Sequence, residues 1–123
     1  MKREGVRSIA RRYGLKAVIL FGSRARGDAK RGSDCDICVS APHFQGEELG
    51  LIGDLCEALG EDVDLCFFER ASASLKHTVA MEGKLLYGSK TVFDRLRLRG
   101  VKEWQDSRKF VETSGAYLDR RGL

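Results

Sequence analysis

The chain has 123 residues, 42% of them apolar, which is enough for one small core but not for two independent catalytic domains. Its 22 basic and 18 acidic residues leave a formal net charge of +4, too small by itself to indicate a nucleic-acid-binding protein. No apolar stretch in the sequence approaches the roughly 20 residues needed to cross a bilayer, so we expect a soluble protein with no membrane partner.

The first half of the chain predicts two helices and three strands. Apolar residues at helical spacing predict a helix over residues 2–13, and a continuous apolar run predicts a buried strand over 17–21. Two further strands are predicted over 34–40 and 63–68. Between them a helical pattern ends at Gly60, a natural C-terminal cap. This part therefore forms a strand–helix–strand unit.

The second half is predicted to be mainly helical. Either Ser72 or Ser74 is expected to cap the start of a helix, and a short apolar run follows at 85–87. Residues 91–118 have a helical pattern, which Gly100 is expected to weaken or break.

Helices that alternate with three short strands predict an α+β fold. We expect a small mixed α/β sheet with helices packed on one face and a C-terminal helix. The sequence has no internal repeat and no linker. We therefore expect one domain over residues 1–123, with a core over about 1–90 and a C-terminal helical extension over about 91–123.

The cysteines indicate a reducing compartment. Each lies in an apolar run, and no secretory segment precedes them, so we expect free thiols and a cytoplasmic protein. Cys35 and Cys38 form a C-x₂-C pair, which is half of a common zinc motif. Residues three apart on a strand point to opposite faces, so the pair is not expected to bind one zinc ion.

A glycine and a serine follow the first strand, at the start of the segment GSRARGDAKRGSDCD. Gly22 lets the backbone turn tightly and approach a ligand, while Ser23 starts a helical turn whose free N–H groups favour an anion. Arg26 lies one turn further on and can add a charge-assisted contact to a phosphate. The expected nucleotide-binding residues are Gly22, Ser23, Arg26 and Ser33.

Two acidic residues begin the next strand and a third lies on the following one. Asp34 and Asp36 are two apart, so both carboxylates project from one face, roughly 6.5–7 Å apart at the backbone. Such hard oxygen ligands suit Mg²⁺, and a third carboxylate on a neighbouring strand suits a two-metal site. Asp64 is favoured over Asp62 for that role because apolar residues flank it. The expected metal-binding and catalytic residues are Asp34, Asp36 and Asp64.

Each of these features also has a purely structural explanation. Asp34 can cap the turn that follows Gly32 and Ser33, and the other two acids can lie on an exposed sheet face. A purely structural interpretation needs a separate explanation for the glycine–serine turn, for the basic loop and for each of the three acids. One catalytic site explains all of them, so the catalytic interpretation is favoured. The segment matches neither a Walker A motif nor GxGxxG, which excludes the P-loop and Rossmann interpretations.

The pattern GS-x₁₀-DCD, followed by VDL, resembles the nucleotidyltransferase superfamily of DNA polymerase beta and kanamycin nucleotidyltransferase. The short chain is similar to its minimal nucleotidyltransferase branch, the antitoxin partners of HEPN-domain toxins, and LKHTVAMEGKLLYG matches the family's later helix and short strand. The resemblance implies that Ser23 and Arg26 contact a triphosphate and that Asp34 and Asp36 hold Mg²⁺. It also implies that Asp64 holds a second metal or acts as general base.

This resemblance implies an enzyme that transfers AMP from ATP to a hydroxyl group, and a tyrosine of a cognate HEPN toxin is the expected acceptor. The alternative is a non-catalytic antitoxin that neutralises its partner by covering it.

The C-terminal segment is rich in aromatic and aliphatic residues, which predicts a docking surface for a helical partner protein. The alternative is that these residues pack on the chain's own sheet. They are Trp104, Phe110, Val111, Tyr117 and Leu118. Aromatic residues are sparse among the basic ones, so nucleic acid ranks below protein as a partner, and a homo-oligomer is left open.

Overall fold

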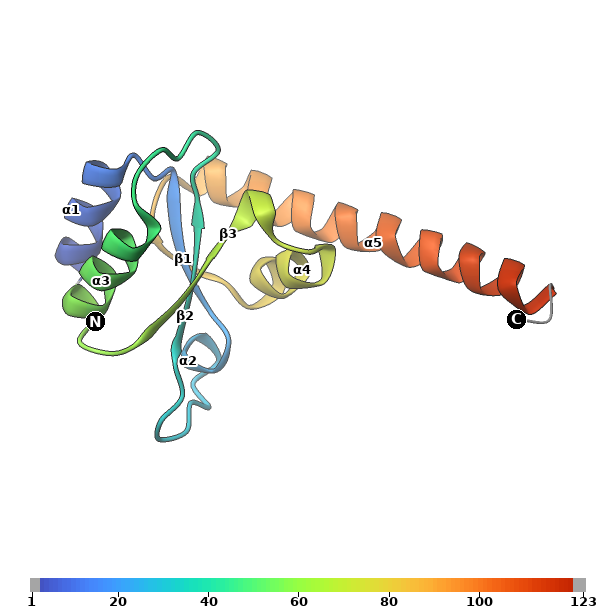
Figure 1. Cartoon of the computed structure of the whole chain (residues 1–123), viewed down its shortest axis with the longest axis horizontal. Helices are drawn as coiled ribbons and strands as arrows, with labels where there is room; N and C mark the ends of the chain where they lie inside the picture. Colours follow the sequence, from blue (N-terminus) through green and yellow to red (C-terminus); the bar gives the residue numbers. More distant parts are fainter. Residues whose placement is uncertain (1–2, 121–123) are drawn as a thin grey trace.

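A computed structural model describes the backbone of residues 3–120 and the side chains of residues 4–109. Five α-helices, four strands and a short 3₁₀ helix (η1) alternate along this part of the chain (Figure 1). In order they are α1 (Arg3–Tyr13), β1 (Ala17–Phe21), α2 (Ser23–Arg26), β2 (Cys35–Ser40), α3 (Glu48–Leu59), β3 (Val63–Phe67), η1 (Phe68–Arg70), α4 (Ala73–Glu82), β4 (Lys84–Tyr87) and α5 (Lys90–Arg120).

The strands form one mixed sheet in the order β3-β2-β1-β4. β1 is antiparallel to both β2 and β4, while β2 and β3 are parallel and are joined through α3. β4 corresponds to the apolar run at 85–87, which the pattern of residues alone did not identify as a strand. The predicted mixed sheet and C-terminal helix are confirmed.

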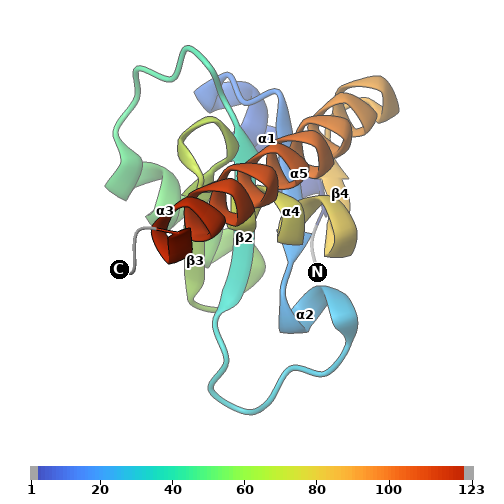
Figure 2. The ribbon, with the colours of Figure 1, turned by 90° about the vertical axis from the view of Figure 1, so that its right-hand side faces the viewer.

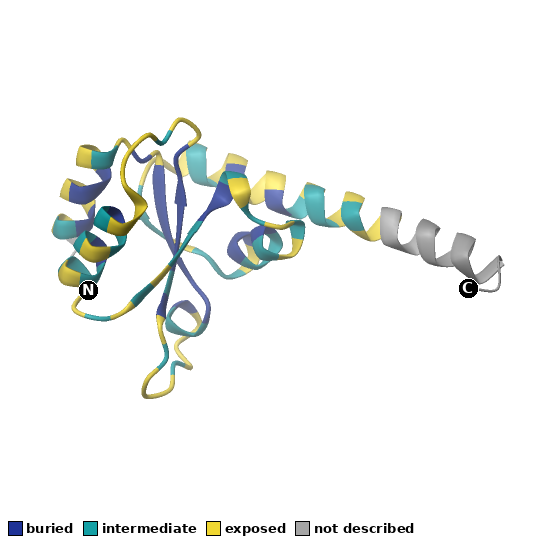
Figure 3. Cartoon of the chain, in the orientation of Figure 1, coloured by how far each residue is buried: buried dark blue, intermediate teal, exposed yellow. Residues whose placement is uncertain are grey.

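Helices cover both faces of the sheet, so the prediction of helices on one face is wrong (Figures 1 and 2). On one face α1 and α3 pack against alternate strand residues such as Val18 and Ile37. On the other face α4 and α5 pack against Ile19 and Cys38. Both faces are needed because β1 is buried along its whole length, as a continuous apolar run predicts (Figure 3).

Two glycines decide how the helices end and cross. α3 ends as predicted at Gly60, which adopts the left-handed conformation at φ 71° and donates its N–H to Cys56. Gly100 does not break α5, contrary to expectation, because it is buried where α5 crosses α4. An added Cβ there would lie 2.6 Å from the carbonyl oxygen of Lys76, so glycine permits the close crossing.

The first part of α5 belongs to the core. Leu96 is buried in the cluster that faces α4. The rings of Trp104 and His77 stack with their centroids 5.2 Å apart, and Glu103 accepts a hydrogen bond from the buried Lys76 at 2.7 Å. Beyond this contact α5 continues to Arg120 and projects away from the sheet (Figure 1). The side chains of Phe110, Val111, Tyr117 and Leu118 lie outside the described residues.

No helix in the described part of the chain has the length and apolar character of a membrane span.

Candidate functional site

The register of the sheet brings the predicted acids to one end of it. Asp36 is the direct partner of Asp64 in the parallel β2–β3 pair and of Phe21 in the antiparallel β1–β2 pair. Asp34 immediately precedes β2, two residues before Asp36, so its side chain projects from the same face. The rival Asp62 precedes β3, and its carbonyl accepts a hydrogen bond from the Cys35 amide at 2.9 Å.

Asp64 is exposed, contrary to the argument that its apolar neighbours isolate it. The reason is that β3 is an edge strand, with one side open to solvent. Its position beside Asp36 comes from the register and not from burial.

Gly22 joins β1 to the short helix α2 and lies directly against Asp36. Its φ of 74° and ψ of −155° are in a region that only glycine adopts readily. An added Cβ would collide with Oδ2 of Asp36. The glycine therefore serves both the sharp turn and the close approach of the turn to the carboxylate.

Replacing Gly22 by alanine is expected to damage the fold and the site together. The backbone conformation costs about 1–3 kcal/mol for a non-glycine residue, and the collision displaces Asp36, for which we expect a loss of turnover on the order of 10²-fold. Gly27→Ala is the matched control, because Gly27 also has a positive φ, 83°, but an added Cβ would meet nothing within 4 Å. Thermal unfolding and turnover of both variants test this. Equal losses of turnover would contradict the role given to the Gly22–Asp36 contact.

The acids form a region of unfavourable negative charge. Burial raises the pKa of Asp36, and the charges of Asp64 and then Asp34 raise it further. A divalent cation relieves such repulsion, and carboxylate oxygens are the ligands that Mg²⁺ prefers. The donor set thus fits this metal.

The side-chain tips themselves are not gathered around one point. Among the described residues no group of three or more histidines, cysteines, aspartates or glutamates is arranged to hold a metal ion. Asp34 and Asp64 are exposed, and exposed side chains change rotamer in picoseconds to nanoseconds. The fold fixes the backbone positions of the acids, and the exposed tips can still move.

The predicted phosphate-binding residues surround α2. Ser23 begins α2, whose first-turn amides have no partner within so short a helix. Arg26 ends it, and its guanidinium binds Asp28 and Glu82. The Ser33 hydroxyl accepts a hydrogen bond from the Lys30 amide at 3.2 Å, which closes the turn before Asp34.

Arg24 is a site residue that the sequence did not reveal. Its Nε forms an ion pair with Glu61 at 2.8 Å, in poor hydrogen-bond geometry, and its Nη2 donates to the Ser33 carbonyl at 2.8 Å. This links α2 to the residues just before Asp34 and Asp62. Glu82 was missed too, because its contact with Arg26 spans 56 residues of sequence and no local pattern predicts it.

Cys35 and Cys38 lie on opposite faces of the sheet, as predicted, in the two separate cores. Burial raises the pKa of the Cys35 thiol to about 11, so it remains protonated at neutral pH. The free cysteines of the described part of the chain are Cys35, Cys38, Cys56 and Cys66.

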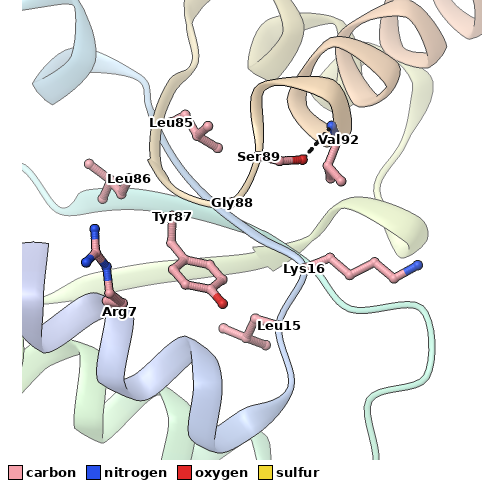
Figure 4. A pocket seen from close by; sticks show the side chains of 9 residues that line it. All are labelled: Arg7, Leu15, Lys16, Leu85, Leu86, Tyr87, Gly88, Ser89 and Val92. Atoms are coloured by element: carbon pink, nitrogen blue, oxygen red, sulfur yellow. Dashed lines mark hydrogen bonds between the residues drawn. The ribbon is translucent and has the colours of Figure 1, made fainter.

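A cavity of about 660 Å³ lies at the other end of β1, between α1, β4 and the start of α5 (Figure 4). Arg7, Lys16 and Tyr87 line it together with apolar side chains, and the Tyr87 ring points toward Leu15. No carboxylate is among its lining residues, so it is not suited to a magnesium ion.

The chain is similar to known nucleotidyltransferases. The family model described as polymerase beta, nucleotidyltransferase matches residues 4–91. A protein adenylyltransferase MntA of Aphanizomenon flos-aquae is 28% identical over 112 residues, covering 80% of this chain and 75% of the relative. The same enzyme of Shewanella oneidensis is 32% identical over 93 residues, covering 74% and 67%. The crystal structure of a toxin–antitoxin with AMP-PNP has a TM-score of 0.79 at 26% identity and covers 100% of both chains.

Proposed function

Because this chain belongs to the polymerase beta nucleotidyltransferase family and is a nucleotidyltransferase, we propose that it transfers AMP from ATP to a hydroxyl group of a HEPN-type toxin. Transfer requires Mg²⁺ and makes the protein an antitoxin. The observation that carries this proposal is the pairing of Asp36 with Asp64 at the strand ends, directly under the Gly22 turn.

Each residue of the site has a proposed task. Asp34 and Asp36 hold the metal, and Asp64 either holds a second metal or takes the proton of the acceptor hydroxyl. Ser23, the amides of α2 and Arg26 bind the triphosphate tail. Bound Mg²⁺ supplies Lewis-acid polarisation of phosphate oxygens. The acceptor oxygen bonds to the α-phosphorus of ATP while the bond to pyrophosphate breaks.

The proposed acceptor and partner rest on the relatives. Two of them are named protein adenylyltransferases, and a similar structure is a toxin–antitoxin solved with AMP-PNP. By the family resemblance the acceptor is a tyrosine of the toxin. We further propose that residues 1–123 form one domain and that the protein acts in the cytoplasm.

A non-catalytic antitoxin is the second candidate. The projecting part of α5 is compatible with an enzyme and with a non-catalytic antitoxin, because both functions require a docked partner. Transfer of the nucleotide distinguishes the two.

Removing either proposed phosphate contact is expected to weaken nucleotide binding. Ser23→Ala and Arg26→Ala should each cost about 1–3 kcal/mol of Mg·ATP binding free energy, the usual value of a lost charge-assisted hydrogen bond. Calorimetric titration measures this. Arg70→Ala is the matched control, since Arg70 also pairs with a glutamate, Glu48, but follows the opposite end of β3. Unchanged affinity in both site variants would place the phosphates elsewhere.

A further inference from the structure

Arg26 and Glu82 form an ion pair across the proposed nucleotide site. Nη1 of Arg26 donates to both carboxylate oxygens of Glu82, each at 2.9 Å. The two side chains are 45% and 26% exposed, so the pair lies at the surface, where a ligand can reach it. It joins the end of α2 to the end of α4.

The position of Glu82 is fixed by the packing of α4. Gly83 follows it, and an added Cβ at Gly83 would lie 2.7 Å from Cγ2 of Ile19, so the helix ends tightly against β1. Arg97 of α5 donates from Nε to the carbonyl of Ala80 at 3.0 Å. Glu82 is thus held relative to β1, the strand that leads into the Gly22 turn.

The contacts of Arg26 leave part of its guanidinium available. Nε donates to Asp28 at 3.2 Å and Nη1 to Glu82, whereas Nη2 has no acceptor among the described residues. A guanidinium carries five N–H donors in a rigid plane, so fixing two nitrogens also fixes the direction of the third. The Arg26 amide donates to the Gly22 carbonyl at 3.0 Å, and Gly22 lies directly against Asp36, so Arg26 is one helical turn away from the acids.

We propose that Glu82 is a positioning residue for the triphosphate: it holds Arg26 so that Nη2 donates to a phosphate oxygen. The inference rests on the proposed function, since it concerns the same nucleotide. Glu82 does not block the site, because Asp28 and Glu82 together engage Nε and Nη1 and leave Nη2 without an acceptor among the described residues.

A mutant cycle on Mg·ATP affinity tests this role in the full-length chain. The variants are Glu82→Ala, Arg26→Ala and the double variant, with Glu48→Gln as matched control because Glu48 pairs with Arg70 outside the site. We expect Glu82→Ala to weaken ATP binding about five- to tenfold. In the Arg26→Ala background the same change should have an effect of less than about twofold, because Glu82 acts only through Arg26. Glu82→Gln, which keeps one acceptor oxygen, should fall between Glu82→Ala and wild type.

Four results would overturn the proposal. Tighter ATP binding by Glu82→Ala would mean that Glu82 competes with the triphosphate for Arg26. An equal loss in both backgrounds would mean that Glu82 acts on the fold or the metal instead, and thermal unfolding of the variants would show which. Wild-type affinity in Glu82→Ala would remove its role but leave the proposed function intact, whereas a wild-type chain that binds no Mg·ATP would defeat both.

Discussion

Replacing Asp34 and Asp36 together by asparagine is expected to abolish nucleotidyl transfer while leaving the fold intact. Asp34 immediately precedes β2 and Asp36 is the second residue of this strand, and neither belongs to the hydrophobic cores. Because metal polarisation of phosphate oxygens contributes several kcal/mol, we expect turnover to fall by roughly three orders of magnitude or more. A transfer assay measures this, with Asp94→Asn on the exposed side of α5 as control. Retained transfer would refute the metal assignment.

The same double variant should be more stable than the metal-free wild type at neutral pH. The pKa of Asp36 is raised in the folded protein, first by burial and then by Asp64, so the folded chain keeps this proton to a higher pH than the unfolded chain. The contribution of Asp36 to stability therefore falls as pH rises through that raised pKa. Removing like charges from adjacent strands should gain about 0.2–1 kcal/mol, which thermal unfolding across pH detects. Metal binding by the wild type should be lost as pH falls through the same pKa.

Removing residues 110–123 is expected to abolish docking of the toxin and leave a folded chain that binds Mg·ATP. This truncation keeps the Lys76–Glu103 pair and the stacking of Trp104 on His77, which fix α5 to α4. Co-purification with the proposed HEPN-type partner measures docking, and thermal unfolding measures the fold.

A shorter chain ending at residue 102 serves as the contrast, since it removes Glu103 and Trp104. The ammonium of Lys76, whose side chain is only 9% exposed, would then lose its partner, at a cost of about 1–3 kcal/mol. If the 1–109 chain unfolds, or binds the toxin as tightly as the full chain, then the projecting part of α5 is not the docking element.

The local elements and the site motif could be predicted because their signals are local. A fully apolar run such as 17–21 predicts a buried strand, and an acid–x–acid pair on a strand places both carboxylates on one face. Both patterns predict local structure independently of the rest of the chain. Local patterns do not predict contacts between residues that are distant in sequence.

Four misses show the limit of local patterns. Gly100 suggests a helix break by its low propensity, but a close crossing of two helices uses the same missing side chain. Asp64 looked enclosed because a sequence does not reveal which strand lies at the edge. Glu82 and Glu61 pair with arginines of α2 that are distant from them in sequence. The helices on both faces are the fourth miss. A strand such as β1, which is buried on both sides, requires a helical layer on each face of the sheet.

Transfer of label from ATP to the partner separates a nucleotidyltransferase from a non-catalytic antitoxin. The purified chain and the proposed HEPN-type partner are incubated with Mg²⁺ and ATP labelled at either the α- or the γ-phosphate. We expect the α-label alone to become attached to the partner, because the γ-phosphate leaves with pyrophosphate. We expect the Asp34→Asn/Asp36→Asn variant to attach no label. A stable complex that carries no label, or label transferred equally by the double variant, would contradict the proposed function.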